Sequence, residues 1–463
     1  MNAFPRLRWA GLFSVGLLAG CKLTPPEPLR TPVPPMSADT NRAVVVERPF
    51  PHAWWTVFHD PELTRLIALA QTNNLDLVQA AARIDAARAR ATIAGADAAV
   101  QVTGSGSGMR QRTSQNTAMQ AGLRRYSQFS VDLNFAYEVD IWGRVKASRK
   151  AAENEIMFSA AERDAAEISL LAQVAKNYLT SLALQREIAV IDNQIARYIE
   201  TEKLQSVRVN SGFSTEFDLQ RTRIERASSE GEREQLRQQE RGYAIARDLL
   251  CGQTAEVPST QPSKPIATVQ TPDAPQRLSL AVLESRPDVL ARRISWDVAV
   301  QRLHVARAEQ LPALRLGGSV GYASQYPEDL LNWKSHLWSI TAGLTAPLFD
   351  GGRLRANVEL AQAQLKEATS VYEAAMLTAY REVADARNTV LALAEQQHAA
   401  ERVRDAAQRA LALARERYEK GFATYLDVID SERSLLTAQR TLVRIEGDRQ
   451  CAIVDLVRAL GWW

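Results

Sequence analysis

The body of this sequence has no long apolar run and no surplus of either charge, and it contains little histidine. Beyond its N-terminus the 463-residue chain has no uncharged apolar stretch of about 18 residues, which excludes a membrane-spanning helix. Its five histidines form no His-Glu-x-x-His pattern, so no zinc hydrolase is indicated. The 53 acidic and 56 basic residues nearly balance, which gives no reason to expect a nucleic-acid partner.

The N-terminus has the layout of a secretory signal. Arg6 and Arg8 provide a basic start, and the uncharged segment 9–18 is too short to cross a bilayer as a helix. The sequence Leu-Leu-Ala-Gly-Cys at 17–21 looks like a bacterial lipobox. Cys21 would then become the N-terminus of the mature protein and carry a diacylglycerol and an N-acyl lipid such as palmitate. The alternative is an ordinary signal peptide with an incidental cysteine.

The residues after Cys21 indicate an outer-membrane lipoprotein on a tether. Lys22 stands where an aspartate would favour retention in the inner membrane. The segment 21–50 is rich in proline and is expected to be an extended linker between the lipid and the folded body. Removal of residues 1–20 takes away two arginines and leaves 54 basic against 53 acidic residues.

The chain repeats itself at a fixed spacing. Three glycines of the first half each have a counterpart 209 residues later: Gly143 and Gly352, Gly212 and Gly421, and Gly252 and Gly461. Matched glycines at one offset predict two copies of one architecture, which we place at 51–260 and 261–463.

Each predicted repeat contains a long segment with neither glycine nor proline. The two segments, 144–211 and 353–420, have 68 residues each and are rich in strong helix formers. A helix of that length is about 100 Å long, so it belongs to a coiled coil or a tubular wall and not to a compact core. Glycine-marked turns lead into return helices over 213–251 and 422–460, which predicts two long helical hairpins.

Two β-strand signals precede each long helix. Apolar and polar residues alternate over 129–138 and again over 338–345, and partner strands begin near Val100 and Leu314. A soluble sheet with one wet face is one explanation. However, four strands are too few to close a barrel, and a strand in lipid cannot leave an edge unpaired. If the sheet lies in a membrane, the pattern therefore predicts closure by other copies of the chain.

Two further sets of residues could carry chemistry but are predicted not to. Asp132, Glu138 and Asp140 would share the polar face of one strand, where we expect them to be hydrated and not to bind a metal. Cys251 and Cys451 lie at positions of the two repeats that differ by about 13 Å along a helix. A disulfide needs Cα atoms within about 7 Å, so we expect no bridge between them.

Five motifs occur in order along almost the whole mature chain. They are Trp54-Trp55 with Phe58, Asp60 and Pro61; Tyr137 to Arg144; Arg286 to Val289; Pro347 to Arg353; and Tyr418 with Gly421, Tyr425, Leu426, Asp430 and Arg433. Together with the duplication they resemble the TolC-like outer membrane factor family. The most similar branch is the lipoprotein efflux branch of the NodT and OprM types.

The resemblance implies an α+β membrane protein. Three chains with four strands each would form a twelve-strand β-barrel in the cell outer membrane, continuous with a long α-helical coiled-coil barrel in the periplasm. The homotrimer would be the passive exit duct of a tripartite efflux system for drugs or toxic compounds, with no catalytic residues, metal or cofactor. The alternatives are the exit duct of a type I protein secretion system and a purely structural envelope lipoprotein, which would need no such strands.

The resemblance also implies protein and lipid partners. A periplasmic adaptor (membrane fusion) protein would link the duct to an inner-membrane transporter of the RND, MFS or ABC type, and outer-membrane lipids would surround the barrel. The adaptor would contact the two hairpin turns at Gly212, Phe213 and Asp218, and at Gly421, Phe422 and Asp427.

The periplasmic gate would follow the second turn. The OprM-like branch has a constriction of Leu, Asp and Arg rings there, and the matching residues are Leu426, Asp430 and Arg433. Their spacing places them near one helical face. A Leu ring would exclude water, and the Asp and Arg rings would pair between chains. The alternative is a surface pair worth a few tenths of a kcal/mol. The first repeat has no acid at the corresponding positions, which are Phe217, Arg221 and Ile224.

Overall fold

The computed structural model describes residues 53–112, 125–254 and 281–461. The predicted signal, Cys21 and the tether lie outside this part of the chain. The described residues form two compact units, which are considered separately: 92–112, 125–152 and 297–367 in the first, and 53–91, 153–254, 281–296 and 368–461 in the second. Within these ranges no helix combines the length and apolar character needed to cross a membrane.

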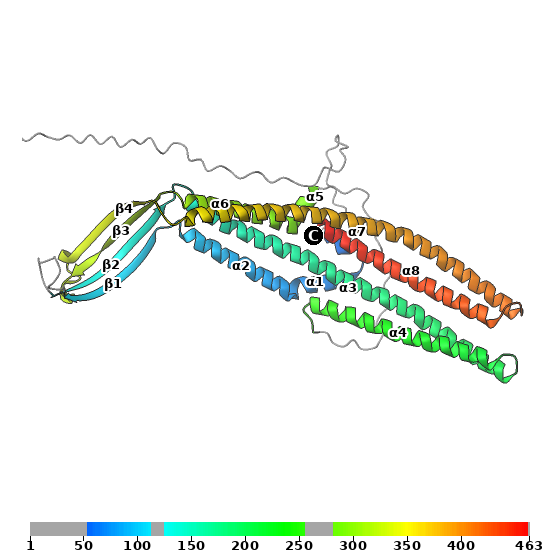
Figure 1. Cartoon of the computed structure of the whole chain (residues 1–463). Coiled ribbons are helices and arrows are strands. Elements are labelled where there is room, and N and C mark those ends of the chain that lie inside the picture. Colours follow the sequence, from blue (N-terminus) through cyan, green and yellow to red (C-terminus); the bar gives the residue numbers. More distant parts are fainter. Residues whose placement is uncertain (1–52, 113–124, 255–280, 462–463) are drawn as a thin grey trace, which may run out of the picture. The chain divides into compact units, whose positions relative to one another are not determined.

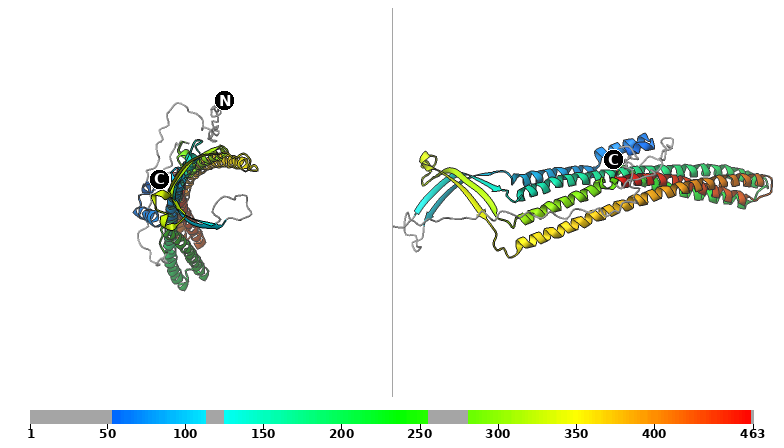
Figure 2. Two further views of the ribbon diagram at one scale, coloured as in Figure 1. Left: turned by 90° about the vertical axis from the view of Figure 1, so that its left-hand side faces the viewer. Right: turned by 90° about the horizontal axis from the view of Figure 1, so that it is seen from above.

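The first unit contains a four-stranded antiparallel sheet (Figure 1). Its strands are β1 (Gln101–Arg112), β2 (Arg125–Val139), β3 (Ala313–Ser324) and β4 (His336–Thr345). They follow one another in the order β1-β2-β3-β4, and Figure 2 shows that the sheet is strongly twisted, as expected for β-strands. Two strands come from each half of the chain, so the prediction of paired strands before each long helix is confirmed.

One face of the sheet is apolar and exposed. The register pairs Phe135 with Gly318, and Gly318 with Ile340, while the adjacent row joins Leu133, Val320 and Trp338. These rows cross from one half of the chain to the other, so the alternation seen in each half becomes one continuous surface. Ile340 is 81% exposed and Trp338 is 69% exposed, which means that nothing in the described chain covers this face.

The opposite face carries small polar side chains that bond to one another. Ser107 and Ser130 are joined by a 2.9 Å hydrogen bond between their hydroxyls, and Asn134 donates to Asp132 at 3.1 Å. The hydroxyl of Ser105 also donates to Asp132. The predicted two-faced character of the strands is therefore confirmed.

The junctions between strand and helix are closed by aspartates. Asp140 accepts hydrogen bonds from the backbone N–H groups of Val145 (3.1 Å) and Lys146 (2.9 Å). In the second half, Asp350 accepts them from Gly352 (3.0 Å) and Leu354 (2.8 Å), and these N–H groups lower the pKa of the Asp350 carboxyl. Both aspartates thus satisfy free N–H groups at the start of a long helix.

The expectation that Asp140 shares a strand face with Asp132 and Glu138 is wrong. The strand ends at Val139, one residue earlier, because the chain turns into the helix there. Glu138 in turn forms an ion pair with Arg144 at 2.9 Å. The three acids therefore have separate local partners.

The helices follow the same order in both halves (Figure 1). Before the strands come α1 (Pro61–Asn73) and α2 (Leu75–Ala96) in the first half, and α5 (Ala281–Glu284) and α6 (Pro287–Ala308) in the second. After the strands come two long hairpins: α3 (Arg144–Asn210) with α4 (Glu216–Leu250), and α7 (Arg353–Glu419) with α8 (Tyr425–Leu460). The helices α3 and α7 have 67 residues each, as the missing glycines and prolines predicted.

The second unit has an apolar core to which short and long helices contribute. Phe58, Leu63 and Ile67 near the start of the described chain are at most 1% exposed, as are Leu179 in α3 and Leu456 in α8. Trp54 (2% exposed) and Phe58 of the N-terminal aromatic motif therefore belong to this core.

A second motif residue, Arg286, joins three elements of this unit. Its guanidinium donates to Asp288 through Nε (3.0 Å) and Nη2 (2.8 Å), to Glu382 of α7 at 2.7 Å, and to the carbonyl of Ala459 in α8 at 2.6 Å. The Arg286 side chain is 6% exposed. Burial opposes its charge, but these acceptors outweigh that effect and raise the pKa of Arg286. The Arg-Pro-Asp motif is thus explained by a buried clamp at the end of α8.

Replacing Arg286 by alanine should destabilise the protein by about 2–3 kcal/mol, because a buried carbonyl and two carboxylates lose their donor. The effect is measured by chemical denaturation followed through the helical circular dichroism. Arg88→Ala is the matched control, because Arg88 also forms a short ion pair, 2.9 Å from Asp85 on the same helix, but both of these side chains are exposed. Equal losses for the two variants would show that the clamp contributes no more than a surface ion pair.

Candidate functional site

The two hairpin turns are built alike. Gly212 has φ +77° and Gly421 has φ +75°, a left-handed conformation that only glycine adopts without strain. In each turn the residue after the glycine forms a backbone hydrogen bond to the preceding helix. The N–H of Phe213 donates to the carbonyl of Arg208, and the N–H of Phe422 donates to the carbonyl of Arg417, both at 2.8 Å. These bonds satisfy carbonyls at the ends of α3 and α7.

The return helices are capped in the same way. Thr215 accepts a hydrogen bond from the N–H of Asp218 (3.3 Å) at the start of α4. Thr424 and Asp427 form a reciprocal capping box at the start of α8. The side chain and backbone N–H of Thr424 lower the pKa of Asp427. The ionised Asp427 carboxylate therefore stabilises the folded protein at neutral pH. This stabilisation is lost as the pH falls through the pKa that Asp427 has in the folded state.

The predicted contact residues thus divide into two groups. Gly212, Gly421, Asp218 and Asp427 shape the turns, which is a local structural role. Phe213 and Phe422 have no such role, because their side chains are 86% and 72% exposed. Two aromatic side chains at matching positions are therefore free to contact a partner.

Leu426, Asp430 and Arg433 lie on the solvent-exposed face of α8. Leu426 is 39% exposed, and Asp430 and Arg433 are exposed, whereas the neighbouring Val428 and Ile429 are buried. The shared helical face is confirmed, and the gate formed by these three residues stays a prediction.

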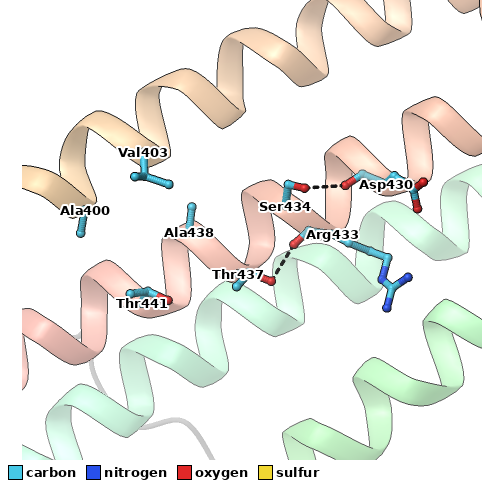
Figure 3. Close-up of a pocket in the computed structure, with 8 residues that line it drawn as sticks. All are labelled: Ala400, Val403, Asp430, Arg433, Ser434, Thr437, Ala438 and Thr441. Carbon is cyan, nitrogen blue, oxygen red and sulfur yellow. Dashed lines mark hydrogen bonds between the residues drawn. The ribbon is translucent and has the colours of Figure 1, made fainter.

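The charges of this face do not pair with each other within the chain. Arg433 Nε lies 3.6 Å from Glu225 Oε2 of α4. The carboxylate of Asp430 has no ion pair among the described residues; the backbone carbonyl of Asp430 accepts from Ser434 at 2.8 Å. Figure 3 shows the Arg433 side chain extending toward the neighbouring helices and away from α7. The cross-hairpin contact with Glu225 was not predicted.

An open groove of about 550 Å³ lies beside these residues, between α7 and α8. Figure 3 shows Ala400 and Val403 of α7 facing Ala438 of α8 across it. The remaining lining residues all belong to α8: Asp430, Arg433, Ser434, Thr437 and Thr441. Small side chains at these positions leave the two helices of this hairpin incompletely packed against each other.

Polar contacts join the two hairpins near their turns. The hydroxyls of Thr222 and Tyr425 are 3.0 Å apart, and Thr222 is completely buried. Arg208 donates to the hydroxyl of Tyr418 at 3.2 Å, with its guanidinium over the Tyr418 ring. Farther along, Arg440 of α8 forms ion pairs with Glu187 and Glu232. Sequence reasoning identified Tyr418 and Tyr425 as motif residues but missed their partners.

The core between the hairpins also contains polar side chains with unmet bonding capacity. Gln194 Nε2 and Tyr198 Oη are buried and have no hydrogen-bond partner within the described ranges. Tyr198 is 1% exposed, and burial raises its pKa to about 12. Unsatisfied polar groups in a core reduce its stability.

The described residues contain no group of three or more His, Cys, Asp or Glu side chains that could hold a metal ion. Cys251 is buried, Cys451 is partly buried, and both are free thiols. The candidate site consists of the exposed Phe213 and Phe422, the Asp430 carboxylate and the polar contacts between the two hairpins.

Tyr425→Phe should remove the contact with Thr222 at a cost of about 1 kcal/mol. Backbone amides of residues 216–224 should then exchange hydrogen about fivefold faster, because the hairpins separate more often. Hydrogen–deuterium exchange with mass spectrometry measures this. Tyr380→Phe, on the partly exposed surface of α7, is the control and should leave these amides unchanged; an identical response in both variants would refute the role of the hydroxyl.

Comparison with known proteins gives consistent matches over nearly the whole chain. The model of the outer membrane efflux protein family matches residues 66–247 and 278–462. Pyoverdine export outer membrane protein OpmQ of Pseudomonas putida is 31% identical over 97% of this chain and 95% of its own length. Outer membrane protein OprJ of Pseudomonas aeruginosa is 33% identical over 88% of this chain and 85% of its own length.

Solved structures agree with these matches. The outer membrane protein VceC of Vibrio cholerae superposes with a TM-score of 0.82 at 26% identity, over 88% of this chain and 98% of VceC. The mixed helical and sheet fold is therefore that of known outer membrane proteins.

Proposed function

The chain belongs to the outer membrane efflux protein family, and on this premise we propose that three copies form the passive exit duct of a tripartite efflux system. The observation that carries the proposal is the four-stranded sheet, which has an exposed apolar face and two edges. Among the described residues β1 pairs only with β2, and β4 only with β3. Three such sheets joined edge to edge give a closed twelve-strand barrel.

The two faces of the sheet suit that assembly. Trp338, Ile340 and Leu344 are between 69% and 81% exposed and would face lipid, where apolar side chains are required. The serine, asparagine and aspartate side chains of the other face would line a water-filled lumen. Edges left open in hydrocarbon would cost several kcal/mol for each unpaired group, so the single chain is not a stable form in the membrane.

The partners follow from the ends of the assembly. We assign the exposed Phe213 and Phe422 to contacts with a periplasmic adaptor protein, which joins the duct to an inner-membrane transporter of the RND, MFS or ABC type. Cys21 would carry the diacylglycerol and N-acyl lipid that anchor the chain. The cargo would be drugs or toxic compounds; OpmQ, for comparison, is a pyoverdine exporter. The relatives thus favour efflux over the protein secretion alternative.

The gate would be formed by α8. Under threefold symmetry Leu426, Asp430 and Arg433 become three rings at the periplasmic end. The Arg433 side chain lies near Glu225 of the same chain. We therefore propose that in a closed duct Arg433 pairs both with this Glu225 and with Asp430 of a neighbouring chain. Only the second hairpin provides an acid at this position, so α8 and not α4 would set the constriction.

The purified full-length protein should migrate as a heat-modifiable trimer and form channels of a single conductance class in planar bilayers. A monomer without conductance would contradict the proposal. The conductance measurement also distinguishes a duct from a structural lipoprotein, which would form no channels in bilayers.

Asp430→Ala should raise leak conductance several-fold and admit vancomycin into cells, because the ring loses its inter-chain pairing. The control is Asp385→Ala, an exposed carboxylate on α7 outside the proposed gate, which should leave both readouts unchanged. Unaltered conductance and unaltered vancomycin exclusion in Asp430→Ala would remove Asp430 from the gate without affecting the proposed duct.

A further inference from the structure

Three arginines extend the apolar face of the sheet at the end that is farthest from the strand–helix junctions. On β1 the residues of that face are Val102, three glycines and then Arg110 and Arg112, because every second residue points to the same side. The register pairs Val102 with Phe135, which fixes Val102 on the apolar face. It also pairs Arg112 with Arg125, so these two arginines lie directly opposite each other. The same face therefore changes from apolar to strongly basic along two neighbouring strands.

The sequence around these arginines provides no carboxylate to balance them. The segment 101–131 contains neither aspartate nor glutamate, and within the described chain none of the three arginines has an ion-pair partner. The next acid along the chain, Asp132, lies on the opposite face, where it accepts a hydrogen bond from Ser105. Like charges directly opposite each other on neighbouring strands destabilise a sheet. An anion between Arg112 and Arg125 would remove that repulsion.

The other connection at this end of the sheet has a different charge pattern. The segment 325–335 between β3 and β4 contains Glu328 and Asp329 against Lys334. In the proposed barrel β4 of one chain adjoins β1 of the next, so these carboxylates are one class of partner for the arginines. The arginines, however, belong to the apolar face, which faces lipid in that barrel. The anions that this face meets are those of lipid headgroups.

The position of the arginines along the strand fits the level of the headgroups. Arg112 is ten residues from Val102. Ten residues of strand extend about 34 Å, which becomes about 26 Å of height at the tilt of about 40° found in barrels. The apolar band of a membrane barrel is about 25 Å tall. A band that begins at the row of Val102 therefore ends at the arginines.

We propose that Arg110, Arg112 and Arg125 bind the phosphate groups of lipids in the outer leaflet of the outer membrane. A guanidinium presents parallel N–H donors that fit two oxygens of one phosphate, and such charge-assisted hydrogen bonds are among the strongest in proteins. Two arginines whose Cβ atoms lie about 5 Å apart can share one phosphate. The aliphatic part of each side chain stays against the apolar band while its charge reaches the headgroups. The inference rests on the proposed barrel and adds a lipid-binding site to it.

Native mass spectrometry of the full-length protein tests the site. The protein is purified in an uncharged detergent and mixed with lipid A, a phosphorylated glycolipid, or with phosphate-free lipid A that has the same acyl chains. The double variant Arg112→Gln with Arg125→Gln removes two charges from the site. The control, Arg90→Gln with Lys334→Gln, removes the same charge from exposed positions outside it. Helical circular dichroism checks the fold of both variants.

The unmodified protein and the control should retain lipid A equally. The Arg112 and Arg125 double variant should retain about tenfold less, which is the effect of losing one charge-assisted hydrogen bond. Phosphate-free lipid A should be retained as weakly by all three proteins. Inorganic phosphate at the same concentration as lipid A should not displace it, because the free anion has no acyl chains to hold it at the apolar band.

Equal retention of lipid A by the double variant, or equal retention of the phosphate-free form, would overturn the site. Displacement by inorganic phosphate would identify the free anion as the ligand and exclude the lipid. Dissociation of the double variant into monomers without a change in lipid retention would assign the arginines to Glu328 and Asp329 of a neighbouring chain. In each case channel conductance of the unmodified protein leaves the proposed duct intact, whereas a protein without trimers or channels removes the duct and this site together.

Discussion

Backbone hydrogen bonding at the two edges of the sheet is the constraint on which the rest of the molecule depends. Every internal row of the sheet is paired, but the outward groups of β1 and β4 have no strand beside them in the described chain. Water can satisfy such groups and hydrocarbon cannot. A sheet with an apolar face in hydrocarbon thus needs further strands, and in the proposed trimer identical chains would provide them without any new sequence.

Different contacts join the helices at the two ends of the second unit. Around Arg286 a buried guanidinium joins α7 and α8 to the start of α6 through four hydrogen bonds. Near the turns the two hairpins meet through other polar contacts, such as that between Thr222 and Tyr425, and Tyr425 also belongs to a buried apolar cluster with Val428 and Ile429.

The sequence predicted the elements well because their signals are local. The absence of glycine and proline predicted a helix over 144–211, and α3 covers Arg144–Asn210; alternation likewise predicted both faces of the sheet. Asp140 was misplaced because alternation does not reveal where a strand stops. The contact of Arg433 with Glu225 was missed because 208 residues separate the two, whereas Asp430 is three positions away. Contacts between hairpins depend on how the helices twist around each other, and a single sequence contains no local signal for that.

The equal length of α3 and α7 has a consequence for how such a chain can change. Each inserted residue advances a helix by about 1.5 Å and rotates it by about 100°. An insertion in one of these two helices therefore shifts its turn and its apolar face relative to those of the other helix. Single insertions and deletions are then tolerated poorly. Variation in the reach of the duct should proceed by paired changes of about seven or eleven residues, which restore the helical phase in both copies.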